Sequence, residues 1–285
     1  MKKLLLLLCI TSSLFASMSE TIHSSLSTYY ENRNYSNSLQ KSSGAVYGVG
    51  ADIHYKASKY KLTYEQGGAV TKKPPLSKDL KNKKIFLRYA YGFNNALELY
   101  LNYIYIIDDN IAITTKGKVY GAGLSYKFNK QLSTYFSQYY TDYKDFNMHQ
   151  SDLKIEYKMK IANVGVKISS ISKYLRVDEE QTNSFTKNTQ KEYFTSGAKL
   201  HLHYQTYHMG LGAYFGKRVF AIMNDGFKIQ HHAMEFNRTY AVGLGKTISD
   251  FVVRFQYIYQ RATELPPLQE NVKVQNLRFI ANYKF

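Results

Sequence analysis

The sequence predicts an all-β protein, a transmembrane antiparallel up-and-down β-barrel of about 14 strands. Three observations predict it. Apolar and polar residues alternate along almost the whole chain, and the connections between the alternating segments are short and long in turn. After the first residues, no apolar run approaches the ~20 residues of a membrane helix. The mean hydropathy is only −0.40 despite 28 Tyr and 16 Phe, as expected where only alternate residues face lipid.

Composition and charge exclude several other classes of protein. The aromatic content is too high for a disordered chain, and 1 Cys excludes a disulfide framework or a Cys-rich zinc module. A net charge of +17 first suggests a nucleic-acid binder. However, the first residues of the chain form a predicted export signal. An exported chain does not meet the nucleic acid of its own cell, so we expect no nucleic-acid partner. The positive charge is expected to serve anionic solutes or surface phosphates instead.

The chain begins with an export signal. Residues 1–3 are basic, residues 4–10 form an apolar core, and a short polar segment ends at Ala16. Cleavage after Ala16 divides the chain into a signal peptide, residues 1–16, and a barrel, residues 17–285. A buried N-terminal helix is the alternative interpretation. Together with the strand pattern, the signal predicts localisation in the bacterial outer membrane.

Alternation with a period of two defines each expected strand. In 152–161 every odd position is apolar and every even position is charged. In 24–30 the alternation is weak, and in 131–142 its phase is ambiguous, so a barrel of about twelve strands is the alternative. The expected strands are 24–30, 44–56, 60–66, 83–93, 96–107, 117–128, 131–142, 152–161, 163–175, 193–204, 207–222, 236–246, 251–261 and 273–285.

Tight connections alternate with long polar ones. All 4 Pro fall in the long set, as expected because proline lacks the N–H donor that a strand ladder needs. Short turns at one end, with both termini beside them, and long loops at the other end are the layout of an outer-membrane barrel. The expected long loops are 31–43, 67–82, 108–116, 143–151, 176–192, 223–235 and 262–272.

The last strand carries a recognition feature. Phe279, Tyr283 and Phe285 share one face, and the chain ends in an aromatic residue. This strand resembles the C-terminal assembly strand of Gram-negative outer-membrane proteins. The resemblance implies the barrel-assembly machinery as a partner, and a surrounding of outer-membrane lipid and lipopolysaccharide. In size and strand number the chain is similar to monomeric porins of about fourteen strands, although it matches no specific family fingerprint. The similarity implies a monomeric, porin-like channel.

The lumen is expected to carry positive charge. A barrel of about 14 strands leaves an opening on the order of 10 Å unless a loop folds into it. Inward-facing cations lower the barrier for anions; lysines at the rims, in contact with lipopolysaccharide phosphates or water, are the alternative. The predicted lumen-lining basic residues are Lys56, Lys61, Arg88, Lys127, Lys154, Lys158, Lys160, Lys199, Arg254 and Arg278.

Three histidines form a candidate metal site. His201 and His203 share the inward face of one expected strand, and a tight turn places His208 opposite His203. Three imidazoles close together can bind zinc or copper. Polar wall residues near the mouth of the barrel are the alternative interpretation. No cofactor is expected.

Small inward residues recur along several strands. Glycine on the lumen face leaves room for water or for a large neighbour, or it lets a curved strand bend. The inward glycines are Gly48, Gly50, Gly121, Gly123, Gly210, Gly212, Gly243 and Gly245.

The predicted function is a passive outer-membrane channel for small polar solutes with a preference for anions. One alternative is a surface or adhesion barrel whose lumen is closed and whose outer loops act. Another is a lipid-modifying enzyme, for which His149, Ser151 and Asp152 are the nearest candidates. Adjacent strand residues point to opposite faces, so these three do not form a triad and we expect no enzyme.

Overall fold

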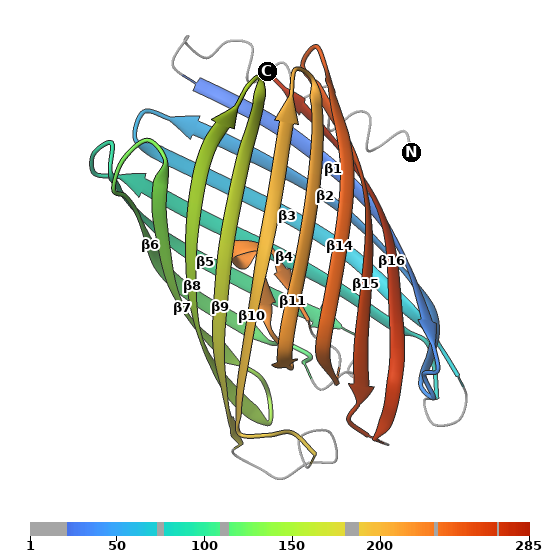
Figure 1. Ribbon diagram of the computed structural model, residues 1–285. Helices are drawn as coiled ribbons and strands as arrows, with labels where there is room; N and C mark the ends of the chain where they lie inside the picture. Colours follow the sequence, from blue (N-terminus) through green and yellow to red (C-terminus); the bar gives the residue numbers. More distant parts are fainter. Residues whose placement is uncertain (1–21, 73–76, 109–113, 180–187, 231–232, 267) are drawn as a thin grey trace.

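The computed structural model describes residues 22–72, 77–108, 114–179, 188–230, 233–266 and 268–285. Within them, fourteen antiparallel strands close into a single barrel (Figure 1). The predicted fold class and strand number are confirmed. The predicted signal peptide, residues 1–16, and its cleavage after Ala16 lie outside the described residues. No helix in the described ranges is long and apolar enough to span a membrane.

Each barrel strand pairs with the barrel strand before it and the one after it. Pairing of the first and last strands, from Ser25 with Lys284 to Ser36 with Lys273, closes the sheet. A closed sheet has no edge, so its backbone N–H and C=O groups pair inside the lipid. The strands are β1 (Ile22–Ser36), β2 (Lys41–Tyr55), β3 (Ser58–Thr71), β4 (Leu80–Gly92), β5 (Leu97–Asp108), β6 (Lys118–Lys127), β7 (Leu132–Asp142), β8 (Phe146–Ile161), β9 (Val164–Glu179), β10 (Glu192–Tyr204), β11 (Tyr207–Arg218), β14 (Met234–Ile248), β15 (Phe251–Glu264) and β16 (Gln269–Lys284).

The C-terminus lies at the end of the barrel that has the short turns, where Phe285 N donates to Ser24 O at 2.9 Å (Figure 1). Phe279 and Phe285 are 47% and 44% exposed on the outer face. The Tyr283 ring packs 4.6 Å from Phe251 and 4.8 Å from Phe285. Tyr283 and Phe285 therefore belong to an aromatic cluster near the short turns, and Phe279 lies exposed on the same outer face.

At the end of the barrel opposite the short turns, the observed strands continue beyond the segments in which apolar and polar residues alternate. β1 continues to Ser36 and β2 begins at Lys41, where the sequence pattern predicted a long loop over 31–43. The outward residues of the added part of β1, such as Asn32 and Asn34, are polar and exposed. Alternation therefore ends where the outer face meets water instead of lipid, whereas backbone pairing continues.

The half of the barrel next to the long connections has a packed interior. One buried apolar cluster joins inward residues of β4 to β10 with the segment 219–223, and a second joins residues of β1, β14, β15 and β16. Inward residues near the short turns, such as His54 and His203, are exposed. The lumen is therefore filled in one half and open to water in the other.

Candidate functional site

An inner loop, residues 219–230, lies inside the barrel between β11 and β14 (Figure 1). Its elements are β12 (Ile222–Met223), η1 (Asn224–Gly226) and β13 (Lys228–Ile229). The prediction of a polar outer loop over 223–235 is therefore wrong. The apolar residues 219–223 are at most 7% exposed, and the Phe220 ring lies 5.0 Å from the inward Phe146 ring. Burying this apolar run inside the barrel removes it from water and stabilises the inward fold.

One anchor of the inner loop lies on β8 and β9. Gln150 Nε2 donates to Ile222 O at 2.8 Å, and Ile222 N donates to Gln150 Oε1 at 2.8 Å. Lys173 Nζ donates to the same carbonyl at 3.0 Å and pairs with Asp152 at 2.5 Å. The wall therefore supplies hydrogen-bond partners for both backbone groups of the buried Ile222.

The tip of the inner loop is held by two cations. Lys154 Nζ lies 2.8 Å from the Asp225 carboxylate, and Arg88 Nη1 donates to Asp225 O at 3.0 Å. Asn224 and Asp225 have φ of 52° and 55°, in the left-handed region that costs energy for residues other than glycine. Desolvation by the surrounding barrel would raise the pKa of Asp225, but the Lys154 ammonium holds that pKa below its usual range. Asp225 is therefore a carboxylate at neutral pH.

The other side of the inner loop contacts β1. Lys228 Nζ lies 3.1 Å from Glu31, which also binds Arg33 Nε at 2.6 Å and lies 3.6 Å from Arg278 Nε. Glu31 is 1% exposed, so three cations compensate one buried carboxylate. Burial lowers the pKa of Lys228 to about 8, although Glu31 opposes that shift. The inner loop thus crosses the lumen from β8 to β1.

The predicted lumen-lining cations, with one exception, occupy inward positions of the strands. Lys56 instead lies in the turn after β2, with Nζ 5.1 Å from the centre of the Tyr55 ring. Lys61 pairs with Asp52 at 3.1 Å. Lys199 and Arg254 form no ion pair with any described residue. The inward cations are Lys61, Arg88, Lys127, Lys154, Lys158, Lys160, Lys199, Arg254 and Arg278.

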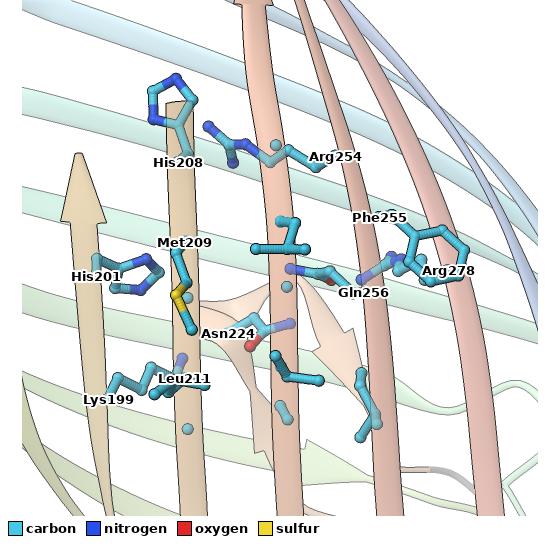
Figure 2. A pocket seen from close by; sticks show the side chains of 18 of the residues that line it. Lys199, His201, His208, Met209, Leu211, Asn224, Arg254, Phe255, Gln256 and Arg278 are labelled. Carbon is cyan, nitrogen blue, oxygen red and sulfur yellow. The ribbon is translucent and has the colours of Figure 1, made fainter. Parts of the chain in front are cut away.

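A cavity of about 430 Å³ lies between the inner loop and the wall made by β10, β11, β14, β15 and β16 (Figure 2). Its ionisable lining residues are all basic, and no Asp or Glu lines it. Those residues are Lys167, Lys199, His201, His203, His208, Lys228, Arg254 and Arg278. The cavity therefore has a positive potential, which water screens less in a confined space than at an open surface.

The three histidines of the predicted metal site lie on this wall but do not converge. His203 and His208 stack with ring centres 4.7 Å apart, and His208 Nε2 lies 2.8 Å from Thr247 Oγ1. Among the residues that the structure describes, no group of three His, Cys, Asp or Glu side chains is placed to hold a metal ion. The geometry is that of polar wall residues near the mouth.

The three residues considered for an enzymatic site are divided between the two faces of β8. His149 is outward, 3.3 Å from Asp178, and Ser151 donates to Gln138 at 2.9 Å. Asp152 is buried on the inward face with Lys173. Asp152 therefore lies on the opposite face from His149 and Ser151, and the three residues do not form a triad.

Sequence reasoning did not find the residues of the inner loop. Alternation does not distinguish Gln150 from other polar residues, and it places Asp225 in an outer loop. The only available signal was the apolar run 219–223, which interrupts an otherwise polar connection.

Comparisons with known proteins show the fold. No family model and no curated protein matches the sequence. The toluene transporter TbuX of Ralstonia pickettii is similar with a TM-score of 0.57 at 8% identity, over 94% of this chain and 90% of that chain. A bacterial polysaccharide outer membrane secretin is similar with a TM-score of 0.57 at 11% identity, over 92% and 98%. Outer membrane protein Omp33 of Acinetobacter baumannii gives 0.50 at 10% identity, over 93% and 100%. The chain has the fold of a bacterial outer-membrane β-barrel.

Proposed function

We propose that this outer-membrane barrel is a channel for the passive diffusion of small polar solutes, with a preference for anions. The observation that carries the proposal is the cavity beside the inner loop, whose ionisable residues are all basic. A ring of cations in a confined pore lowers the electrostatic barrier for anions and raises it for cations.

The inner loop sets the size limit of the proposed channel. A barrel of fourteen strands has a backbone radius of roughly 14 Å, and the inner loop divides that lumen. A cavity of about 430 Å³ accommodates solutes the size of a sugar, an amino acid or a small organic acid. Folded proteins and polymers are excluded.

A closed-lumen barrel that acts through its surface is the second candidate. The packed apolar clusters in the half next to the long connections favour it, because a solute must pass them or displace the inner loop. The two candidates differ in whether the inner loop moves. Its contacts at the tip are made by charged groups reached by lumen water, since Asp225 is 58% exposed, and such contacts exchange more readily than a buried core.

Planar bilayer recordings test the channel. The protein, refolded in detergent, is added to one side under a KCl gradient, and the reversal potential is measured. Discrete current steps with a reversal potential toward that of chloride are expected. Cation selectivity would overturn the anion preference. Absence of steps over a wide voltage range would overturn the channel and favour the closed-lumen barrel.

The proposed partners follow from the outer face. Outer-membrane lipid and lipopolysaccharide would surround it, and the barrel-assembly machinery would recognise Phe279, Tyr283 and Phe285. We propose a monomer, because one chain closes the barrel without a partner strand.

A further inference from the structure

One wall of the cavity is built from glycine. On adjacent strands, His201 lies opposite Gly210, Gly210 opposite Gly243, Gly243 opposite Gln256, and Gln256 opposite Arg278. Gly212 and Gly245 lie two residues along the same two strands, β11 and β14. We call Gly210, Gly212, Gly243 and Gly245 the glycine floor.

Two glycines of the glycine floor are not covered by an aromatic ring, unlike several other inward glycines. A Cβ atom at Gly210 or Gly212 would come no closer than 3.5 Å and 3.6 Å to any neighbour. A Cβ atom at Gly121 would lie 2.5 Å from the Tyr139 ring, and one at Gly123 2.5 Å from the Tyr100 ring. Glycine therefore makes room for a tyrosine ring at Gly121 and Gly123, whereas at Gly210 and Gly212 the nearest side chains are those of His201 and Lys199, at van der Waals distance.

Basic side chains border the glycine floor on both edges, as Figure 2 shows. Lys199 and His201 come from β10, and Arg254 and Arg278 come from β15 and β16. Lys199 Nζ lies 5.8 Å from the centre of the Tyr214 ring and forms no ion pair with a described residue, although the Asp225 carboxylate acts on it electrostatically. Arg254 has no ion pair with a described residue, and Arg278 shares Glu31 with two other cations. Lys199 and Arg254 therefore face the floor without an ion-pair partner among the described residues, and Glu31 only partly compensates Arg278.

We infer that the glycine floor and its basic edges form a binding site for a small solute with a double negative charge on carboxylate or phosphate oxygens. The inference rests on the proposed channel and names its solute. Arg254 supplies a planar fork that suits bidentate binding of a carboxylate or phosphate, and Lys199 supplies a point charge from the opposite edge. Three strand spacings of ~4.8 Å separate β10 from β15, and Arg254 lies four residues along β15 from the rung of Lys199, which ends at Ile258. The two side chains therefore reach one solute from opposite corners of the wall, each by leaning along it.

Uncharged polar groups complete the site. Gln256 lies on the rung between the floor and Arg278, and Gln260 lies deeper, where it donates to Thr239 at 3.1 Å. Amides of this kind orient a solute without adding charge. The side chains of Gln256 and Arg254 lie over Gly243 and Gly245, and a flat solute can lie close to the wall at Gly210 and Gly212.

Binding and conduction are measured separately in the test. The detergent-refolded protein is titrated calorimetrically with succinate, inorganic phosphate and neutral succinamide at low salt. Binding of succinate, phosphate or both is expected, with dissociation constants of about a millimolar or below that weaken as salt is added. Succinate alone assigns a carboxylate site, and phosphate alone a phosphate site. Binding of neither, or equal binding of succinamide, would overturn the inference.

Matched variants locate the site. Arg254→Gln and Lys199→Gln are each expected to weaken binding about three- to tenfold. Lys246→Gln removes one charge from the outward face of β14 and is expected to leave binding unchanged. Gly212→Val, whose Cβ meets no atom closer than 3.6 Å, adds a branched side chain to the floor and is expected to block binding. Equal effects of Lys246→Gln and Arg254→Gln would indicate a general charge effect and overturn the site. If bilayer recordings show current steps but calorimetry shows no binding, the binding site is rejected and the channel is retained. If calorimetry shows binding but no current steps appear, the channel is rejected and the binding site is retained.

Discussion

Lys154 Nζ lies 2.8 Å from the Asp225 carboxylate, and this ion pair ties the tip of the inner loop to the barrel wall. The two residues are 71 positions apart in the chain. The pair places a negative charge in a lumen that is otherwise lined mainly by cations. Asp225 therefore acts both as an anchor of the inner loop and as a local compensation of the positive charge.

Asp225→Asn is expected to loosen the inner loop and to strengthen the anion preference. The substitution removes the ion pair with Lys154 and one negative charge from the lumen, so both effects have the same direction for anion flow. The measurement is the reversal potential and the open probability in planar bilayers. Asp250→Asn, in the short turn after β14, is the matched control. If both variants shift selectivity equally, Asp225 has no special position in the ion path.

Gln150→Leu is expected to release the inner loop from β8. The substitution leaves the Ile222 N–H and C=O without their Gln150 partners, at a cost of about 1–3 kcal/mol for each buried group left unsatisfied. Limited proteolysis of the refolded barrel should then cut within 219–230, and current noise should increase. Gln138→Leu, on the outward face of β7, is the control. An uncut inner loop in Gln150→Leu would show that apolar packing alone holds it.

Raising the pH above about 8 is expected to favour the docked inner loop, in which Lys228 contacts Glu31. As the pH rises, proton linkage stabilises whichever state binds fewer protons. Burial lowers the pKa of Lys228 to about 8 against the opposing effect of Glu31. In an undocked loop the amine would have a pKa of about 10.4. Between these two values the docked state therefore binds fewer protons, and docking strengthens as pH rises. Bilayer recordings at about pH 7 and pH 9.5 should show fewer opening events at the higher pH.

Lys228→Met tests the origin of this pH response. The substitution keeps an unbranched chain and removes the titrating amine. The response should disappear in this variant, and persistence of the full response would assign it to another group.

Alternation in the sequence predicts the strands that form the barrel wall, but it does not predict the inner loop that lies inside the barrel. Alternation in segments such as 152–161 depends only on which face meets lipid, and that is a local property of each strand. The inner loop depends on contacts between distant strands, such as Lys154 with Asp225 and Lys228 with Glu31. Its apolar run 219–223 overlapped the predicted strand 207–222, whereas β11 ends at Arg218. Alternation cannot distinguish a wall strand from an apolar segment folded inside.

The sequence predicts which basic residues face the lumen, but not which of them lie beside a carboxylate. Inward cations follow from strand phase, so Lys199, Arg254 and Arg278 were found. The prediction of Lys56 as a lumen-lining residue is wrong, because the turn begins one residue earlier than alternation suggests. Which cations are compensated depends on the positions of carboxylates such as Glu31 across the sheet, and strand phase carries no such information.

Phe285→Ser is expected to reduce the amount of barrel in the outer membrane. The terminal ring packs 4.8 Å from Tyr283 on the outward face, and its loss removes part of the proposed assembly signal. Heat-modifiable migration of membrane fractions measures the folded amount. Phe128→Ser, an outward aromatic residue near another short turn, is the control. Similar losses in both variants would indicate a general need for aromatic residues at this level.

The same substitution at two inward glycines should have opposite effects on stability. At Gly48, a Cβ atom would lie 2.2 Å from the Tyr29 ring. Tyr29 Oη donates to Glu65 at 2.6 Å, and its ring lies 4.0 Å from the Arg278 guanidinium, so the ring cannot move without losing these contacts. Gly48→Ala is expected to destabilise the barrel by about 1–3 kcal/mol through overpacking.

At Gly212 the nearest atom to an added Cβ is 3.6 Å away, so Gly212→Ala meets no clash. Replacing a strand glycine that needs no special backbone conformation restricts the unfolded chain, and this is expected to add about 0.4–1 kcal/mol of stability. Urea unfolding of both refolded variants, followed by tyrosine fluorescence, measures the difference. If Gly48→Ala were as stable as Gly212→Ala, Tyr29 would not be fixed over Gly48, and the lumen beside β1 would be less tightly packed than described above.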